Sequence, residues 1–370
     1  MDARLIEPPS PPRAPAPAAF AALDLGTNNC RLLVGAPAGN GFRVLDSFSR
    51  IVRLGEGLHD TGRLNPDAMD RALAALRACA DRLARRPIRA VRAIATEACR
   101  RAANGGEFLA RVRRDTGLGI DVISTREEAE LALESCAPLL RGGGRRALLF
   151  DIGGGSTELA WVRLDGHGGD PAAPPSLIGT ISLPVGVVTL SERFGAAGYT
   201  AAGFEAMVAD TLARLAAFER VHCIAHEIAQ GGVRMVGTSG TVTTLAGISL
   251  GLTRYRRPLV DGAVLTSEAA DAALALLFGL GRSGLNAHPC VGAERSEFVL
   301  PGCAIFEAIR RIWPVPHLTV ADRGLREGML LRMMRERRGR HTVRNEASNE
   351  ASNDALGSGR LAVALAARPG

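Results

Sequence analysis

Short apolar runs alternate with longer stretches of helical periodicity along most of the chain. The short runs are bounded by polar turn residues, which is typical of buried strands, whereas apolar residues three or four positions apart indicate helices. The predicted strands are 20–23, 31–34, 147–150 and 235–237, and the predicted helices are 66–83, 127–139 and one that begins near Val242. This alternation favours an α/β fold built from layers.

An internal repeat divides the chain. Residues 19–34 read AFAALDLGTNNCRLLV and residues 146–162 read RALLFDIGGGSTELAWV, so each has an apolar run, an Asp-x-Gly turn, small polar residues and a second strand-like run. One such turn is common in proteins. Two of them, one small domain apart, predict two similar domains whose glycine hairpins face each other. Such hairpins bind phosphate oxygens through backbone N–H groups, and their aspartates bind a divalent cation directly or through water.

A third glycine-containing loop, residues 236–241 (VGTSGT), follows a predicted strand and opens a helix. Backbone donors at a helix N-terminus favour an anion. By itself the loop is more typical of a helix capped by Ser or Thr. Together with the two hairpins it indicates a phosphate site.

The composition describes a folded chain with different ends. Its 370 residues are 46% hydrophobic and 22% charged, which suits two domains. Residues 1–17 are rich in Pro and Ala, and residues 336–370 lack apolar periodicity, so we expect disordered tails. The start lacks the pattern of a signal peptide, no apolar run reaches the ~18 residues of a membrane span, and the seven cysteines form no C-x-x-C pair. These features predict a cytoplasmic protein.

All 45 basic residues are arginine. The absence of lysine excludes the P-loop, Schiff-base chemistry and the protein-kinase ion pair. The net charge of +7 is concentrated, because residues 71–114 hold twelve arginines against three acidic residues. This excess favours an anionic partner such as nucleic acid, a membrane surface or polyphosphate, but it is equally typical of solvated helix faces.

Seven segments, in order along the chain, carry a resemblance to a known family. They are DLGTNN (24–29), ATEACRRAAN (95–104), ISTREEAELAL (123–133), FDIGGGSTEL (150–159), SLPVGVVTLSERF (182–194), VGTSGTVTTLAG (236–247) and DRGLREGML (322–330). Over about residues 18–335 the chain resembles the exopolyphosphatase/guanosine pentaphosphate phosphatase (Ppx/GppA) family in its short, two-domain form. The resemblance implies an α/β fold with two actin-like (ASKHA, RNase H-like) domains and a phosphate-binding cleft between them. Domain I would hold residues 18–138 with a helix returning at about 323–335, and domain II residues 139–317.

The resemblance also implies hydrolysis of a terminal phosphoryl group and gives roles to the carboxylates. Glu128, in the REEA segment, matches the family's catalytic glutamate and would be the base for the attacking water. Glu127 fits a capping box with Ser124 and would cap the helix instead. Glu158 would be a second catalytic carboxylate, unless it is an edge-strand residue in solvent. Asp24 and Asp151 would hold Mg²⁺, the expected cofactor.

The remaining candidates are donors to phosphate. They are Thr27, Asn28, Gly153, Gly154, Gly155 and Ser156 in the hairpins, Gly237, Ser239 and Gly240 in the third loop, and the arginines Arg53, Arg100 and Arg295. Of these arginines, Arg100 matches a family residue at the cleft, whereas a role on the surface stays open for each of them.

The leading hypothesis is a Mg²⁺-dependent exopolyphosphatase that releases orthophosphate from the ends of inorganic polyphosphate. The alternative within the family is a guanosine pentaphosphate (pppGpp) 5′-phosphohydrolase, and the scarcity of aromatic residues for stacking a guanine leans toward polyphosphate. A kinase or a non-catalytic sensor on the same superfold is a further alternative, against which the REEA segment and the four acidic residues argue. We expect no specific nucleic acid and no membrane as partner, and the resemblance leaves a homodimer open.

Overall fold

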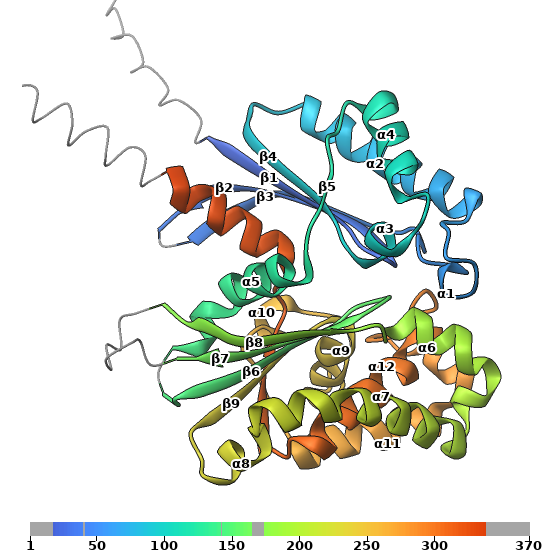
Figure 1. The fold of residues 1–370 in the computed structure, drawn as a ribbon, viewed down its shortest axis with the longest axis vertical. Helices are drawn as coiled ribbons and strands as arrows, with labels where there is room; N and C mark the ends of the chain where they lie inside the picture. The colour runs from blue at the N-terminus through green and yellow to red at the C-terminus, as the bar shows by residue number, and fades with distance from the viewer. Residues whose placement is uncertain (1–17, 40, 142, 165–173, 338–370) are drawn as a thin grey trace, which may run out of the picture.

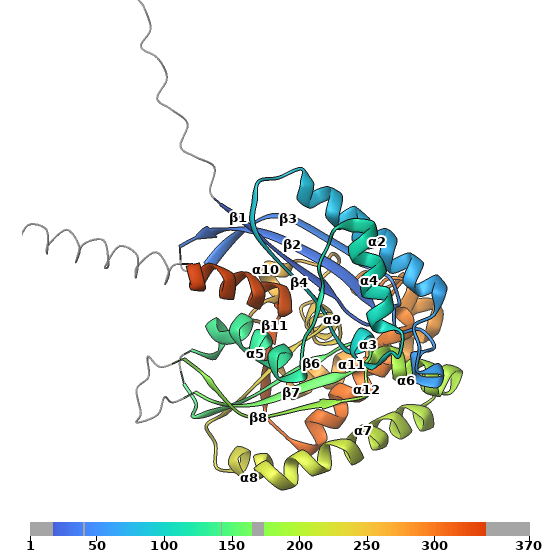
Figure 2. The same cartoon turned by 45° about the horizontal axis from the view of Figure 1, so that its top comes forward.

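The computed structural model describes residues 18–39, 41–141, 143–164 and 174–337, and it places them in two halves, each built on one sheet (Figure 1). The predicted tails, residues 1–17 and 336–370, lie outside the described residues, except for residues 336 and 337. Figures 1 and 2 show the two sheets one above the other, with helices on their outer sides and two helices between them. In the described part of the chain, no helix combines the length and hydropathy needed to cross a membrane.

The first sheet has the strand order β3-β2-β1-β4-β5. Strands β1, β2 and β3 pair antiparallel, and β1, β4 and β5 pair parallel. The elements of this half are β1 (Ala19–Leu25), β2 (Asn29–Ala38), β3 (Gly41–Ile51), α1 (Leu58–Thr61), α2 (Pro66–Ala84), β4 (Ile88–Ala95), α3 (Glu97–Arg101), α4 (Gly105–Thr116) and β5 (Asp121–Val122). Helices α2 and α4 cover the outer face, where Leu76 and Phe108 pack with Leu23 in one apolar core.

The second sheet has the order β10-β11-β9-β6-β7-β8. Its strands are β6 (Arg146–Ile152), β7 (Thr157–Arg163), β8 (Ser176–Leu183), β9 (Val233–Thr238), β10 (Val264–Thr266) and β11 (His317–Ala321). The helices of this half are α6 (Val187–Phe194), η2 (Gly195–Tyr199), α7 (Ala201–His222), α8 (Ile224–Ala229), α9 (Gly240–Ser249), α10 (Arg257–Val260), α11 (Ser267–Ala287) and α12 (Ser296–Ile312). A core that includes Phe150, Leu245 and Phe306 joins this sheet to α7, α9, α11 and α12.

The two sheets repeat one topology. Strands β6, β7, β8, β9 and β11 take the places of β1, β2, β3, β4 and β5, with the same parallel and antiparallel pairings. The register repeats too: Asp24 lies opposite Arg31, and Asp151 lies opposite Glu158. The internal repeat and the actin-like α/β fold class are therefore confirmed, whereas the exact domain boundaries at 18–138 and 139–317 stay a prediction.

Two helices lie between the sheets (Figures 1 and 2). They are α5 (Thr125–Cys136), which continues into the short η1 (Ala137–Leu140), and the last described helix, residues 325–337. They approach so closely that a Cβ on Gly328 would lie 2.1 Å from the Leu131 carbonyl oxygen. With the inner faces of both sheets they form a third core, which we call the shared core; it includes Leu33, Leu149 and Leu330.

Strand periodicity directs the two aspartates toward the space between the sheets. Side chains of a strand alternate between its faces. In β1, Phe20 and Ala22 belong to the shared core, so Asp24 is the next residue on that same face. In β6, Ala147 and Leu149 have the same relation to Asp151. Each aspartate therefore lies one pleat beyond the shared core, at the end of its strand.

Candidate active site

A cleft of about 910 Å³ lies between the two halves. Both glycine hairpins, the third loop and the start of α5 line it, together with residues of the turn before helix 325–337. Thirteen of the sixteen predicted site residues line this cleft: Asp24, Thr27, Asn28, Glu128, Asp151, Gly153, Gly154, Gly155, Ser156, Glu158, Ser239, Gly240 and Arg295. Arg53, Arg100 and Gly237 are not among its lining residues.

The tips of the two hairpins touch each other. A Cβ on Gly155 would lie 2.7 Å from the Thr27 hydroxyl oxygen, and one on Gly154 would lie 3.1 Å from the Asn28 Cβ. Backbone contacts from Val187 N to Gly153 O at 3.0 Å and from Val188 N to Gly154 O at 2.8 Å hold the second tip against the start of α6. Glycine is needed here because the Thr27 and Asn28 side chains lie against the backbone of the second tip and leave no room for another side chain.

Glu158 follows the second hairpin, lines the cleft as expected and is buried, so the alternative of an edge-strand residue in solvent is wrong. The hydroxyls of Ser156 and Ser182 donate to its Oε1 at 2.5 and 2.9 Å. Two hydroxyl donors favour the charged form, but burial raises the pKa of Glu158 more than they lower it. The repeat explains its place, since Glu158 stands beside Asp151 as Arg31 stands beside Asp24.

Glu128 reaches the cleft from the first turn of α5 and is 7% exposed. Ser124 is the N-cap of α5, and its hydroxyl accepts from the Glu127 N–H at 3.1 Å. The Glu127 carboxylate does not complete the predicted capping box, because it pairs with Arg92 instead. Consecutive helical residues point in different directions. Glu127 turns outward to pair with Arg92 at 3.0 Å, and Glu128 turns inward.

Arg100 lies behind Glu128, away from the cleft lining where a phosphate contact was predicted. Its guanidinium donates to Glu128 Oε2 at 3.2 Å, to Glu97 Oε2 at 2.7 Å and to the Ile123 carbonyl at 2.8 Å. Glu97 and the Ile123 carbonyl hold the guanidinium in place, and the guanidinium in turn holds the Glu128 carboxylate from one side. The contacts make Arg100 a residue that positions Glu128.

Burial raises the pKa values of four carboxyl groups that line the cleft, those of Asp24, Glu128, Asp151 and Glu158. The pKa of Glu128 lies well above its ordinary value because burial and the charge of Glu158 outweigh the opposing effect of Arg100. Burial and Glu158 likewise raise the pKa of Asp151 to about 7. Clustered acids with raised pKa values are characteristic of sites that accept protons or bind cations.

Asp24 and Asp151 fit a divalent cation that is shared with a substrate. Asp24 Oδ1 is buried without a hydrogen-bond partner, which leaves an oxygen lone pair free for a ligand. No group of three or more His, Cys, Asp or Glu residues suited to a metal occurs in the described part of the chain. Mg²⁺ matches this donor set, because it keeps several waters and binds through one or two carboxylates plus substrate phosphates.

The third loop forms both a cap and part of the cleft. Ser239 has φ +148°, and its hydroxyl accepts from the Val242 N–H at 3.2 Å, which makes it the N-cap of α9. Ser239 and Gly240 line the cleft, whereas Gly237 lies inside β9. A Cβ on Gly237 would lie 2.5 Å from the Phe150 ring, so packing against that ring explains this glycine and the predicted phosphate contact does not.

Arg53 bridges the halves at the mouth of the cleft, where a contact with the substrate chain was predicted. It forms an ion pair with Glu297 on α12 and lies over the Phe298 ring at 5.6 Å. Close by, the Gly57 N–H donates to Glu192 Oε1 of α6 at 3.0 Å. The side chain of Arg53 is thus engaged by the protein itself.

Sequence analysis missed several lining residues, including Arg31, Arg50, Tyr255 and Arg326. Two of them had a readable signal. Arg31 occupies the repeat position of Glu158. Arg326 belongs to the DRGLREGML segment, which carried the family resemblance without receiving a role.

Comparison with known proteins supports the family resemblance of the sequence. A family model described as the Ppx/GppA phosphatase family matches residues 34–337. A crystal structure of the Aquifex aeolicus member of the Ppx/GppA family is 28% identical, with a TM-score of 0.71 over 86% of this chain and 98% of that one. An exopolyphosphatase-like protein is 27% identical, with a TM-score of 0.74 over 85% and 97%.

An exopolyphosphatase from Cytophaga hutchinsonii shares the fold, with 22% identity and a TM-score of 0.75 over 86% of this chain and 98% of that one. The family model spans most of the described residues and includes most of the cleft lining. The chain therefore belongs to the Ppx/GppA phosphatase family.

Proposed function

We propose that this phosphatase is a Mg²⁺-dependent exopolyphosphatase. The observation that carries the proposal is a set of four cleft-lining arginines, Arg31, Arg50, Arg295 and Arg326, none of which pairs with a carboxylate in the described part of the chain. By contrast, Arg257 and Arg323 each form carboxylate ion pairs. Unpaired guanidinium groups suit bidentate contacts with successive phosphates.

In the proposed reaction a water attacks the terminal phosphorus while Glu128 accepts its proton. The bond between that phosphorus and the bridging oxygen breaks, and the electron pair leaves with the shortened chain. The products are orthophosphate and a polyphosphate one unit shorter. Glu158 would orient the water, and the hairpin N–H groups would hold the phosphoryl oxygens.

A metal held by Asp24 and Asp151 would supply charge neutralisation for the phosphates. The direction of the pKa shift of Glu128 suits its role, because a carboxylate with a raised pKa is a stronger general base. Exchanging Glu128 for Gln should lower turnover by about 10²–10⁴. Glu127→Gln is the matched control and should retain activity, because Glu127 points to Arg92.

A guanosine pentaphosphate phosphohydrolase is the second candidate, and one observation favours it. The cleft also has an apolar wall formed by Val291, Phe298 and Val299, with Tyr255 nearby in the lining. Such a wall could contact a purine. The aromatic residues are scarce in the chain, yet two of them lie at the cleft.

The deciding experiment is phosphate release from polyphosphate and from guanosine pentaphosphate, side by side, with Mg²⁺ and with chelator. Faster, chelator-sensitive release from polyphosphate is the expected result. A preference for the nucleotide would move the function to the second candidate. Release from neither substrate would contradict both.

A further inference from the structure

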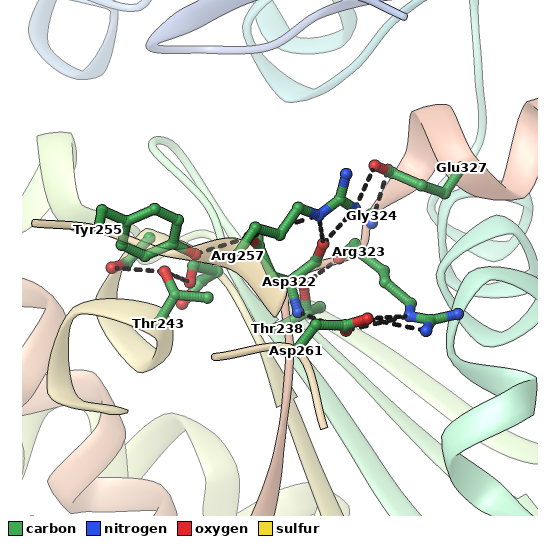
Figure 3. Close-up of polar contacts among 11 residues, drawn as sticks. Thr238, Thr243, Tyr255, Arg257, Asp261, Asp322, Arg323, Gly324 and Glu327 are labelled. Atoms are coloured by element: carbon green, nitrogen blue, oxygen red, sulfur yellow. Dashed lines mark hydrogen bonds and ion pairs between the residues drawn. The ribbon is translucent and has the colours of Figure 1, made fainter. Parts of the chain in front are cut away.

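The turn that joins β11 to helix 325–337 is fixed to the second half by a polar network (Figure 3). Asp322 accepts from the Tyr255 hydroxyl at 2.6 Å, and its carbonyl accepts from Arg257 Nε at 3.1 Å. Glu327 accepts from Arg257 at 2.9 Å and from the Gly324 N–H at 3.0 Å. The network holds the start of the helix rigidly beside the cleft.

The two arginines of this segment differ in their partners. Arg323 makes a bidentate pair with Asp261, with contacts of 3.0, 3.0 and 2.8 Å (Figure 3). Arg326 also lines the cleft, but it has no hydrogen bond and no ion pair within the described residues. The residue is half-buried in the cleft wall, so the five donors of its guanidinium are open to a ligand in the cleft.

Four charged side chains surround Arg326. Burial lowers the pKa of its guanidinium, the carboxylates of Asp24 and Glu327 attract it, and the guanidinium groups of Arg31 and Arg257 repel it. Glu327 is already engaged by Arg257 and Gly324. Asp24 belongs to the first hairpin, where the terminal phosphates would bind. Within the described residues, Arg326 is therefore an unpaired cation of the cleft lining, close enough to Asp24 of the first hairpin to interact with its charge.

We propose that Arg326 is a phosphate-binding residue of the cleft, which places a phosphate group of the substrate next to Asp24. This assignment rests on the proposed function and adds a substrate contact to it. The contact comes from a helix whose first turn is fixed to the second half by the polar network. Because helix 325–337 packs in the shared core, the guanidinium is presented by a rigid element. A rigid, bidentate donor would bind phosphate at little cost in ordering.

The test is the dissociation constant of inorganic tripolyphosphate, measured by isothermal titration calorimetry. Chelator is present so that no turnover occurs. Arg326→Met should raise the dissociation constant roughly 10- to 100-fold, the usual effect of losing a charge-assisted contact. Arg332→Met is the matched control: Arg332 lies on the same helix but pairs with Glu134 at 2.6 Å, and it does not line the cleft. That variant should bind like the wild type.

Arg326→Lys provides a second variant that keeps the positive charge if the Met variant fails to fold. It loses the bidentate geometry, so we expect a smaller loss of affinity. A wild-type dissociation constant in a folded Met or Lys variant would overturn the assignment of Arg326 alone. Absence of tripolyphosphate binding to the wild type would overturn this assignment, whereas absence of phosphate release with Mg²⁺ would overturn the proposed function.

Discussion

Asp151→Asn should stabilise the metal-free protein at neutral and alkaline pH. Asp151 is held in the cleft without a hydrogen bond or direct ion pair in the described part of the chain, and its pKa is about 7 against an ordinary 3.8. The folded state therefore holds a proton that the unfolded state has lost. Stability falls as pH rises from about 4 to about 7, and the loss is complete above that range.

The magnitude follows from the size of that shift. A rise of about three pKa units corresponds to about 4 kcal/mol of destabilisation once the carboxylate is charged, at 1.36 kcal/mol per unit. A buried amide without full hydrogen bonding costs about 1–3 kcal/mol in its place. The net gain is about 1–3 kcal/mol, which corresponds to a rise in Tm of about 2–4 °C for a chain of this size.

Thermal unfolding with chelator at pH 8 and at pH 5 measures this effect. Asp151→Asn should raise Tm at pH 8, and the difference should shrink at pH 5, where the wild-type carboxyl is itself protonated. Asp81→Asn on the exposed face of α2 is the control and should leave Tm unchanged at both values. A variant that is no more stable than the wild type at pH 8, or that gains equally at both pH values, would refute the reasoning.

Three further outcomes are expected. Arg100→Gln removes the group that lowers the pKa of Glu128, so the acid limb of the pH–rate profile should move to higher pH, and an unmoved limb would contradict the positioning role. Gly155→Ala places a methyl group 2.7 Å from the Thr27 hydroxyl and should lower kcat/KM at least about tenfold, because the two hairpins would be displaced from each other. Gly106→Ala is the control and should leave kcat/KM unchanged, because the space around its Cβ is open. Chelator should abolish phosphate release and Mg²⁺ should restore it; activity that survives exhaustive chelation would remove the metal from the mechanism.

The sequence predicted the parts of the site that depend on local pattern. The hairpins, Asp24 and Asp151 follow from the repeat, because strand periodicity alone directs each aspartate to the inner face. The cap at Ser124 follows from the capping pattern at the start of α5, whereas the place of Glu128 at the cleft follows from the family resemblance. The hairpin and cap relations are short in sequence, and each is set by backbone repeat distances.

Contacts between distant segments could not be predicted. Arg100 meets Glu128 across 28 positions, and Arg53 meets Glu297 across the mouth of the cleft. The third loop predicts a phosphate contact at Gly237 because it follows a strand and opens a helix, whereas the contact with the Phe150 ring decides the role of this glycine. The sequence does not show whether an arginine forms an ion pair with a carboxylate in the folded protein. For this reason the sequence analysis gave Arg326 no role.

The shared core has a mechanical consequence. It is the place where α5 and helix 325–337 touch both sheets, so a hinge rotation of one half against the other would have its axis near these two helices. Such a rotation would separate the hairpin tips most and displace residues near the axis least. Glu128 starts from α5 and Arg326 from helix 325–337, so both would stay nearly fixed while the cleft opens and closes. The protein could then exchange products and substrates without rebuilding the surroundings of Glu128, the proposed proton acceptor, at every turnover.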